Sequence, residues 1–250
     1  MKTLNLKTLN IKKTLITGAI CSALPVAAMA DSAPLAQAKL GNERVENNID
    51  VGVARQKDND DDYISTFSGT LKLTDDIRVS TEMDSEGFLE VSAGHGFNLG
   101  KSYIEPYVGY GKTDHSDVKT AGVFASMKLN PSILVFADTS YEWRDANSDL
   151  GLGAQEELLD QQEWKTAVGA NYTLNEKVVV GYTLHHDRTT DSGLLSYEDD
   201  NRNSHEVSLA FNATDKITPY VQYTYGPHRV STGSMTVDEY SVEAGVNFRF

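Results

Sequence analysis

The stretch Tyr240-Ser-Val-Glu-Ala-Gly-Val-Asn-Phe-Arg-Phe250 decides the fold, because its apolar and polar residues alternate up to the last position of the sequence. Successive side chains of a β-strand point to opposite faces, so this stretch predicts a strand with one apolar and one polar face. The same period of two recurs along the chain from Asn48 onward. The apolar face of this strand carries Tyr240, Val242, Ala244, Val246, Phe248 and Phe250.

The N-terminal region has the pattern of an export signal. Residues 2–13 contain four lysines and no acid, and an apolar stretch from Leu15 leads to the small-residue site Ala28-Met-Ala30. This order is typical of a secretory signal peptide. The one cysteine, Cys21, lies inside it, so we expect no disulfide or thiol chemistry in the mature chain. We predict a signal peptide at 1–30, a periplasmic N-terminal extension at 31–47 and a barrel domain at 48–250. For the start of the mature chain a plug of the lumen is the open alternative.

Charge and hydropathy restrict the class of protein. The formal net charge is −14, and removal of the four lysines of the signal peptide takes it to about −18. So acidic a chain is a poor ligand for nucleic acid, and we expect no nucleic-acid partner. No mature stretch approaches the roughly 18 to 20 apolar residues of a membrane helix. If the mature chain spans a membrane, it must therefore do so as a β-barrel.

The period-two pattern predicts twelve antiparallel strands. Many have close to the roughly 9 to 11 residues that a tilted strand needs to cross a bilayer core. An even number fits a closed bacterial barrel, with both chain ends on the periplasmic side. The predicted strands are 49–55, 63–73, 77–83, 87–98, 103–111, 120–129, 133–144, 163–174, 178–186, 204–213, 217–226 and 239–250.

The connections between these strands alternate in length. Tight turns at 74–76, 130–132, 175–177 and 214–216, with a nearly as short one at 99–102, are every second connection. The others are longer, polar and acidic, at 56–62, 112–119, 145–162, 187–203 and 227–238, with 84–86 as a short exception. Outer-membrane barrels have short periplasmic turns and long external loops. A soluble β-sandwich, the main alternative, has no reason to sort its loops in this way.

Aromatic residues lie at both ends of the apolar faces, as expected for rings at two membrane interfaces. The band between them is predicted to face lipid, through residues such as Val91, Val123, Val168 and Leu209. One aromatic set lies near the long loops, namely Tyr110, Tyr141, Trp143, Trp164, Tyr225 and Tyr240, and the other near the tight turns, namely Phe97, Tyr172, Phe211, Phe248 and Phe250.

With its terminal Val246-Asn-Phe-Arg-Phe250, the chain resembles a bacterial outer-membrane β-barrel whose C-terminal signal is recognised by the barrel-assembly machinery. The resemblance assigns that signal to Tyr240, Val246, Phe248 and Phe250. Size and strand number make the chain similar to the small monomeric porins of the oligogalacturonate-specific porin family. This resemblance implies an all-β, twelve-stranded antiparallel transmembrane barrel in the outer membrane of a Gram-negative bacterium. It also implies outer-membrane lipid, lipopolysaccharide and small solutes as partners.

That family moves acidic sugars along basic tracks, so we compared the charges on the inward faces. The predicted lumen is nearly balanced, which favours weak cation preference or neutral solutes over acidic sugars. Opposite charges that paired across the lumen would instead close it, whereas inward glycines such as Gly109 and Gly245 suggest unfilled space. The predicted lumen residues are Lys72, Arg78, Lys128, Arg144, Lys165 and Arg249, against Asp50, Glu82, Glu90, Glu105, Asp138, Glu142, Glu206 and Glu243.

One external hairpin carries residues suited to catalysis or metal binding. His185, His186 and Asp187 end one strand, and Ser204, His205 and Glu206 begin the next. A hydroxyl, an imidazole and a carboxylate could act as nucleophile, base and orienting group of an outer-leaflet lipid hydrolase. Alternation places Ser204 and His185 inward but His186 and His205 outward. We therefore expect no catalytic residue, no metal site and no cofactor.

Two external segments suggest further roles. Asp58, Asp60 and Asp62 have the alternate spacing of a calcium loop but lack its glycine and its final glutamate. With the acidic run 198–200 they more simply form an acidic surface that shares divalent cations with lipopolysaccharide. The loop from Leu150 to Asp160 contains Leu158 and Leu159. Its alternatives are an inward constriction, a short helix at the rim, or an exposed loop.

The sequence therefore predicts an outer-membrane channel for passive diffusion of small hydrophilic solutes through a mixed-charge lumen. Two alternatives are left open at this point. One is a non-conducting barrel with a structural or adhesive role, and the other is the lipid hydrolase described above.

Overall fold

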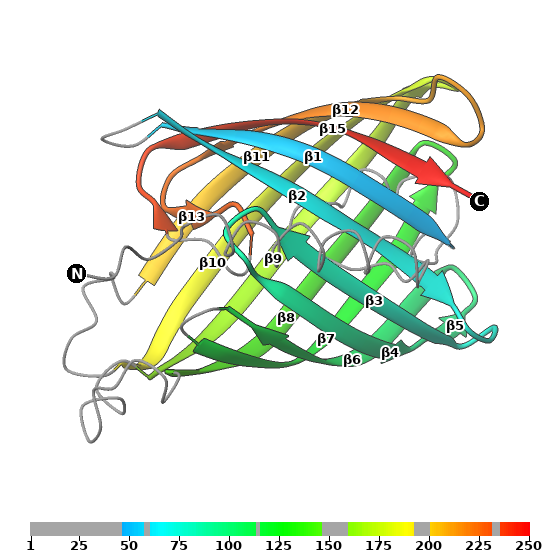
Figure 1. Cartoon of the computed structure of the whole chain (residues 1–250). Helices are drawn as coiled ribbons and strands as arrows, with labels where there is room; N and C mark the ends of the chain where they lie inside the picture. The colour runs from blue at the N-terminus through cyan, green and yellow to red at the C-terminus, as the bar shows by residue number, and fades with distance from the viewer. Residues whose placement is uncertain (1–46, 58–60, 114–115, 147–159, 193–200, 232–235) are drawn as a thin grey trace, which may run out of the picture.

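The chain folds, in a computed structural model, into one antiparallel sheet that closes on itself as a barrel (Figure 1). Residues 1–46, which include the predicted signal peptide and nearly all of the predicted extension, lie outside the described residues. No helix of the described chain has the length and apolar character needed to cross a membrane. The structure describes residues 47–57, 61–113, 116–146, 160–192, 201–231 and 236–250.

Thirteen strands make up the barrel sheet, and a separate pair forms a short hairpin. The barrel strands are β1 (Asn48–Lys57), β2 (Asp61–Lys72), β3 (Ile77–Asp84), β4 (Leu89–His95), β5 (Phe97–Leu99), β6 (Ser102–Lys112), β7 (Ser116–Asn130), β8 (Ile133–Ala146), β9 (Gln161–Asn175), β10 (Val178–Ser192), β11 (Asn201–Phe211), β12 (Ile217–Tyr225) and β15 (Tyr240–Arg249); the hairpin is β13 (His228–Arg229) with β14 (Thr236–Val237).

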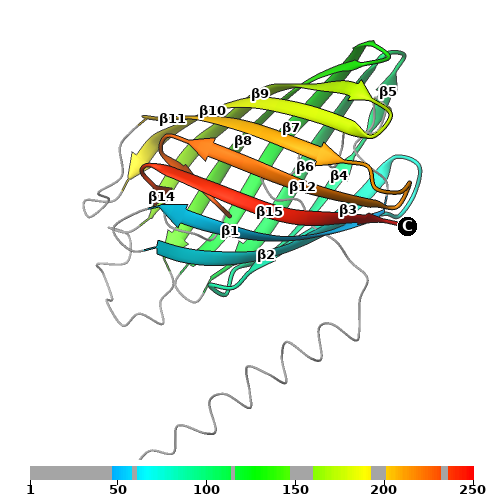
Figure 2. The same cartoon turned by 90° about the horizontal axis from the view of Figure 1, so that it is seen from above.

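Two pairings close the ring. The C-terminal β15 lies between β1 and β12 (Figure 2), and β4 and β5 both pair with β6. Since β4 and β5 are two parts of one interrupted strand, the ring has twelve strands, as predicted. The prediction of an unbroken strand at 87–98 was wrong at Gly96. There the Tyr103 side chain of β6 occupies the space that a side chain at Gly96 would need.

At one end of the barrel, short turns are closed by their own side chains. Asn175 Oδ1 accepts hydrogen bonds from the backbone N–H of Lys177 (2.9 Å) and Val178 (3.0 Å). Thr214 Oγ1 accepts from Lys216 (3.2 Å) and Ile217 (3.0 Å) in the same way. Thr74 and Asn130 begin the equivalent turns with similar bonds. This local hydrogen bonding explains why Asn or Thr opens each of these turns.

At the opposite end, the strands run further than predicted. β9 and β10 stay paired from Val178 and Asn175 out to Ser192 and Gln161. The loop predicted at 187–203 is therefore shorter, because the polar segments after His186 and before Ser204 continue the ladder. We call this end the external end and the tight-turn end the periplasmic end, following the predicted topology. The C-terminal residue lies at the periplasmic end (Figures 1 and 2).

The outer surface has the predicted apolar band and two aromatic belts. Large apolar side chains such as Val123, Val168 and Leu209 are exposed on it. Both predicted aromatic sets lie on the outward face, and Tyr63 and Tyr223, which the sequence analysis did not assign, extend the external belt. Tyr182 also faces outward, but it lies within the apolar band, across from Val207 and Ala170.

Inward glycines do not leave empty space, which corrects the prediction. A side chain at Gly122 would collide with the Tyr107 ring, and one at Gly245 with the Tyr220 ring. Carboxylates do the same elsewhere, since Glu90 lies against Gly109. At these positions the glycine makes room for a large side chain of a neighbouring strand.

Candidate solute path in the barrel interior

The predicted lumen residues all lie on the inward faces of their strands. This follows from the alternation of buried and exposed positions along each strand, and β11 shows it without a break. Those that are buried are Asp50, Arg78, Glu82, Glu90, Glu105, Glu142, Lys165, Glu206 and Glu243, while Lys72, Lys128, Asp138, Arg144 and Arg249 are partly exposed.

One inward cluster joins β3 to β6 through an ion pair. Arg78 Nη2 lies 2.5 Å from Glu105 Oε2, and its guanidinium lies 4.9 Å from the centre of the Tyr103 ring. The Tyr103 hydroxyl donates to the same Glu105 oxygen. A charged guanidinium, a carboxylate and a phenol therefore satisfy one another in the wall, so this basic residue already has a partner.

A second inward cluster joins β8, β9 and β11. Glu142 accepts from Arg144 at 2.6 Å and from Lys165 at 2.9 Å. Glu163 pairs with Arg202, whose guanidinium also lies 3.8 Å from Asp187. Sequence reasoning missed Glu163, Asp187 and Arg202 as inward residues. Alternation would have found Glu163, but Arg202 lay outside the predicted strand.

A third inward cluster has more acceptors than donors. The Tyr220 hydroxyl lies 2.6 Å from Asp50 Oδ1 and 2.7 Å from Glu243 Oε1, and the Asn247 amide donates to Asp50 at 3.2 Å. A phenol has one proton, so it donates to one carboxylate only. The single phenol hydroxyl thus brings acidic side chains of two neighbouring strands, β1 and β15, together in the wall.

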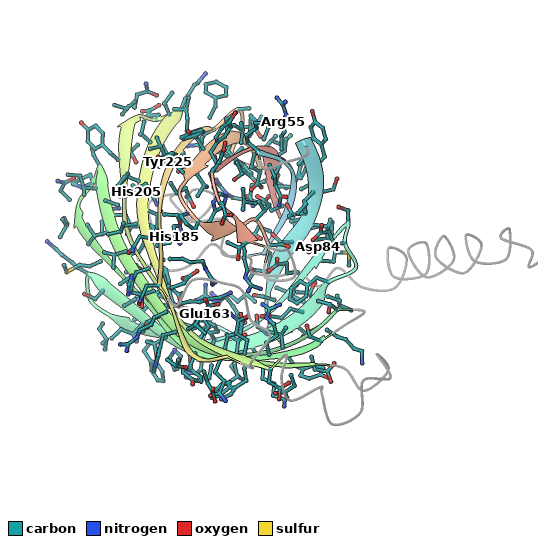
Figure 3. All side chains as sticks on the ribbon, turned by 90° about the vertical axis from the view of Figure 1, so that its left-hand side faces the viewer. Arg55, Asp84, Glu163, His185, His205 and Tyr225 are labelled. Carbon is teal, nitrogen blue, oxygen red and sulfur yellow. The ribbon has the colours of Figure 1, made fainter. Side chains whose placement is uncertain are left out.

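The last external loop folds into the barrel mouth, which the sequence did not indicate. Val230 and Val237 of the β13–β14 hairpin are buried against the inward Ala54 of β1 and Ile64 of β2. Figure 3 shows the hairpin inside the ring of strands. Two valines in a segment predicted to be polar were the available signal. The constriction weighed at Leu158 and Leu159 lies outside the described residues.

Hydrogen bonds hold the hairpin to opposite sides of the ring. Ser231 Oγ donates to Asp84 Oδ2 of β3 at 2.5 Å, and Arg229 donates to Gln161 Oε1 of β9 at 3.3 Å. In the ring of twelve strands β9 is six strands from β2 in either direction. Contacts to Ile64 on β2 and to Gln161 on β9 therefore mean that the hairpin crosses the full width of the mouth.

His228 is the buried polar anchor of the hairpin. Its Nδ1 lies 2.7 Å from the Gly226 carbonyl oxygen, which can only accept, so Nδ1 carries the proton. The Nε2 atom of the neutral ring then accepts from the Ser241 hydroxyl of β15 at 2.7 Å. Burial, with a smaller contribution from the nearby His185, lowers the pKa of His228 below its ordinary value of 6.5. The docked hairpin thus favours neutral His228.

Beside the hairpin the lumen contains a polar cavity that is partly open to solvent. Its walls mix bases, acids and uncharged polar groups, so it can hydrogen-bond a hydrated or polyhydroxylated solute from several sides. Besides the hairpin residues, its lining includes Asp138, Lys165, His185, Asp187, Ser204, Glu206, Gln222, Thr224, Ser241 and Glu243.

The hairpin considered for catalysis divides its residues between the two faces, as alternation predicted. His186 and His205 face outward, where they hydrogen-bond Asn203 (2.8 Å) and Tyr182 (2.8 Å). His185 faces inward and lies 3.2 Å from Glu206. Ser204 is directly opposite His185 in the ladder, yet the hydrogen bonds of the described residues do not join them. The nucleophile–base contact of a hydrolase is therefore not formed.

Metal binding finds no support among the residues that the structure describes, which contain no group of three or more His, Cys, Asp or Glu side chains suited to hold an ion. His185 is separated from His186 and His205 by the barrel wall. Of the suspected calcium loop, Asp58 and Asp60 lie outside the described residues, as does the acidic run 198–200.

The fold matches those of small porins. The NanC porin aligns with a TM-score of 0.66 and 14% sequence identity, over 81% of this chain and 100% of its own. The KdgM porin, in complex with disordered oligogalacturonate, aligns with a TM-score of 0.58 and 13% identity, over 81% and 99%. An outer-membrane channel from Pseudomonas putida F1 gives 0.56 and 11%, over 85% and 98%. No protein-family model and no curated protein matches the sequence.

These likenesses confirm the predicted fold: the chain has the all-β, twelve-stranded architecture of bacterial outer-membrane porins. The three proteins just compared are named as porins or as a channel. At these identities the agreement concerns the fold alone, and the solute must be argued from the lumen itself.

Proposed function

We propose that the protein is a monomeric channel of the Gram-negative outer membrane through which small hydrophilic solutes diffuse passively. The observation that carries this proposal is the polar cavity of mixed charge inside a barrel with the fold of small porins. Diffusion needs no cofactor and no reacting group. The barrel-assembly machinery, acting on Tyr240, Val246, Phe248 and Phe250, and the surrounding lipid are the other partners of the proposal.

The inward charges favour cationic or neutral solutes. Acidic residues outnumber basic ones on the inward face, so anions gain little from the lumen. Four of the eight inward basic residues pair with wall carboxylates, namely Arg78, Arg144, Lys165 and Arg202. The inward basic residues are Lys72, Arg78, Lys128, Arg144, Lys165, Arg202, Arg229 and Arg249; the acidic ones are Asp50, Asp84, Glu82, Glu90, Glu105, Asp138, Glu142, Glu163, Asp187, Glu206 and Glu243.

The β13–β14 hairpin supplies the constriction of the proposed channel. It crosses the mouth and limits solutes to those that pass beside it. Burial of Val230 and Val237 contributes about 1.5 to 3 kcal/mol each to docking, from which the ordering of the loop is subtracted. A modest net docking energy lets the hairpin leave the mouth transiently.

The test uses mature protein refolded into vesicles and planar bilayers. The swelling rates of the vesicles in neutral sugars of increasing size measure how fast each sugar passes through the protein. The reversal potential of the planar bilayer under a salt gradient measures the preference for cations or anions. We expect small sugars to enter faster than large ones, together with weak cation selectivity. Strong anion selectivity would contradict the assignment of the lumen and favour acidic sugars. Heat-modifiable gel mobility serves as the control for folding.

A non-conducting barrel is the second candidate, and the docked hairpin is the observation that favours it. In that case the external surface would provide adhesion or envelope integrity. The two candidates separate when the hairpin is displaced by Val230→Asp with Val237→Asp. A channel then conducts more, whereas a filled structural barrel is silent with or without the hairpin.

A further inference from the structure

The outward-facing basic residues of the described strands gather at the external end of the barrel. Other basic residues on these strands face the lumen, and Lys101, Lys177 and Lys216 lie in the periplasmic turns. The whole sequence is acidic, so this distribution does not follow from composition. The outward set consists of Arg55 and Lys57 on β1, Lys112 on β6, Lys119 on β7 and Arg188 on β10.

Four of these five residues lie directly across the ladder from an aromatic residue of the external belt. Tyr and Trp rings of such a belt lie at the level of the lipid headgroups. The basic groups beside them therefore lie at the depth of the headgroup phosphates. The pairs are Arg55 with Tyr63, Lys57 with Tyr240, Lys119 with both Tyr110 and Trp143, and Arg188 with Trp164.

The periplasmic belt has no such partners. Phe97 lies across from Ile104, and Phe211 lies across from Val178. These two rings thus have aliphatic partners across the ladder, and the Phe97 ring also lies beside His95, with ring centres 4.5 Å apart. Outward basic residues on the strands thus lie beside the aromatic rings of the external interface and not beside those of the periplasmic one.

The outward residues of β10 change from apolar to basic towards Arg188, as expected for a strand that leaves the bilayer core. They change from Val180 through Tyr182 and Leu184 to His186 and then Arg188. Arg188 is exposed, and the planar fork of arginine binds phosphate oxygens in pairs. Elsewhere in the belt carboxylates moderate the charge, because Lys119 pairs with Asp145 and Lys112 lies 3.3 Å from Asp117.

We propose that the external belt is a binding surface for phosphorylated anionic lipids of the outer leaflet, with Arg188 beside Trp164 as its principal contact. The proposal rests on insertion of the barrel in a bilayer, but not on whether its lumen conducts. This proposal differs from the earlier hypothesis that acidic loops bind lipopolysaccharide through shared divalent cations. Here basic side chains of the protein bind the lipid phosphates directly.

The two tryptophans report on this surface directly. Trp143 and Trp164 are the only ones in the sequence, and both lie across from a basic residue of the belt. Protein is folded into phosphatidylcholine vesicles that contain increasing fractions of chain-brominated phosphatidylglycerol, or of chain-brominated phosphatidylcholine as reference. Bromine quenches tryptophan on contact, so the two curves give the relative binding constant of the anionic lipid at the belt.

Two triple variants make the comparison specific. Arg55→Gln, Lys119→Gln and Arg188→Gln remove three positive charges from the belt. Lys101→Gln, Lys177→Gln and Lys216→Gln remove three from the periplasmic turns and match the first variant in net charge. Gel mobility confirms that both fold.

The wild type should prefer the anionic lipid about fivefold, the gain expected for one basic residue near a membrane surface. High salt should reduce the preference. It should disappear in the belt variant and persist in the turn variant. Equal quenching by both lipids in the wild type would overturn the proposal, as would equal losses in the two variants. The quenching results do not depend on whether the protein conducts ions, so failure of the channel proposal would not affect this test.

Discussion

The two ends of the barrel are built from the same strands but closed by different means. At the periplasmic end, Thr74, Asn130, Asn175 and Thr214 close tight turns with hydrogen bonds that span three residues or fewer. At the external end, the segment after β12 folds into the mouth and contacts strands on opposite sides of the ring. The alternating strands form the wall of the barrel, whereas the connections between them determine how each end of the barrel is closed.

The two ends differ in the range of the contacts that stabilise their closure. A turn cap is local and forms as soon as its strands pair. The hairpin gains its energy from residues distant in sequence, such as Ala54 and Asp84, so it docks only when the ring is complete. Mutations in the periplasmic turns should therefore change only the free energy of unfolding. Mutations in the external hairpin should change the conductance.

The largest effect is expected from Val230→Asp combined with Val237→Asp. Each change places a carboxylate against Ala54 and Ile64. Burial of a charge without a partner costs about 3 to 5 kcal/mol, more than the hairpin gains from its valines. The hairpin should leave the mouth and unitary conductance should rise. Asp238→Asn, at an exposed position beside β14, is the control and should leave conductance unchanged. Wild-type conductance in the double variant would show that the hairpin does not restrict the path.

A smaller effect is expected from Ser231→Ala, which removes the hydroxyl donor to Asp84. A hydrogen bond to a charged group contributes about 1.5 to 3 kcal/mol, so the ratio of open to closed time should rise at least about tenfold. Dwell times of single channels measure this ratio. Ser85→Ala, in the exposed turn next to Asp84, is the control. Identical dwell times in wild type and Ser231→Ala would mean that this contact does not hold the hairpin.

Acid should loosen the hairpin. Because the pKa of His228 is lowered in the docked state, docking is unaffected above its ordinary value of 6.5 and weakens as the pH falls from there towards the docked pKa. The Gly226 carbonyl favours the charged form of His228, but burial outweighs it and the nearby His185 opposes it. Ser241 hydrogen-bonds the ring, and Glu206 and Glu243 line the same cavity. Open probability should therefore rise on acidification.

The variant His228→Gln checks the origin of this pH dependence. It keeps a polar side chain at the anchor but cannot titrate, so its open probability should not change between pH 7 and mildly acidic solution. Retention of the full pH response in this variant would assign it to other groups, such as His185.

The smallest effect is expected at the periplasmic end. Asn175→Ala and Thr214→Ala each remove a turn cap, which should lower the free energy of unfolding by about 1 kcal/mol per site. Urea titration in vesicles, followed by tryptophan fluorescence, measures the change. Conductance and dwell times should match the wild type. A conductance change without a change in stability would contradict the division between the two ends.

The wall of the barrel could be predicted from sequence because its rules are local. Alternation placed Glu142, Lys165, Glu206 and Glu243 on the inward face, and the turn residues marked where strands end. In a strand with lipid on one side and water on the other, neighbouring residues must alternate between apolar and polar. A period of two in such a segment is therefore strong evidence for a barrel strand. The strand at 87–98 failed at Gly96 because the interruption depends on Tyr103 of the next strand.

The contents of the lumen could not be predicted, because they depend on which side chains meet across strands. Tyr220 lies between Asp50 and Glu243, which are distant in sequence. The inward glycines suggested empty space, but rings from neighbouring strands fill it. The hairpin was missed because Val230 and Val237 are too few to form a periodic pattern, and their partners belong to β1 and β2.

Single-channel conductance of the mature protein, compared with a variant in which 227–238 are replaced by a Gly-Ser turn, tests the central claim most directly. The claim is that the barrel is a channel whose external mouth is restricted by the hairpin. The account predicts small unitary steps with weak cation selectivity in the wild type and larger steps of similar selectivity in the variant. If both proteins fold and insert but neither conducts, the lumen is filled below the hairpin and the channel assignment is wrong.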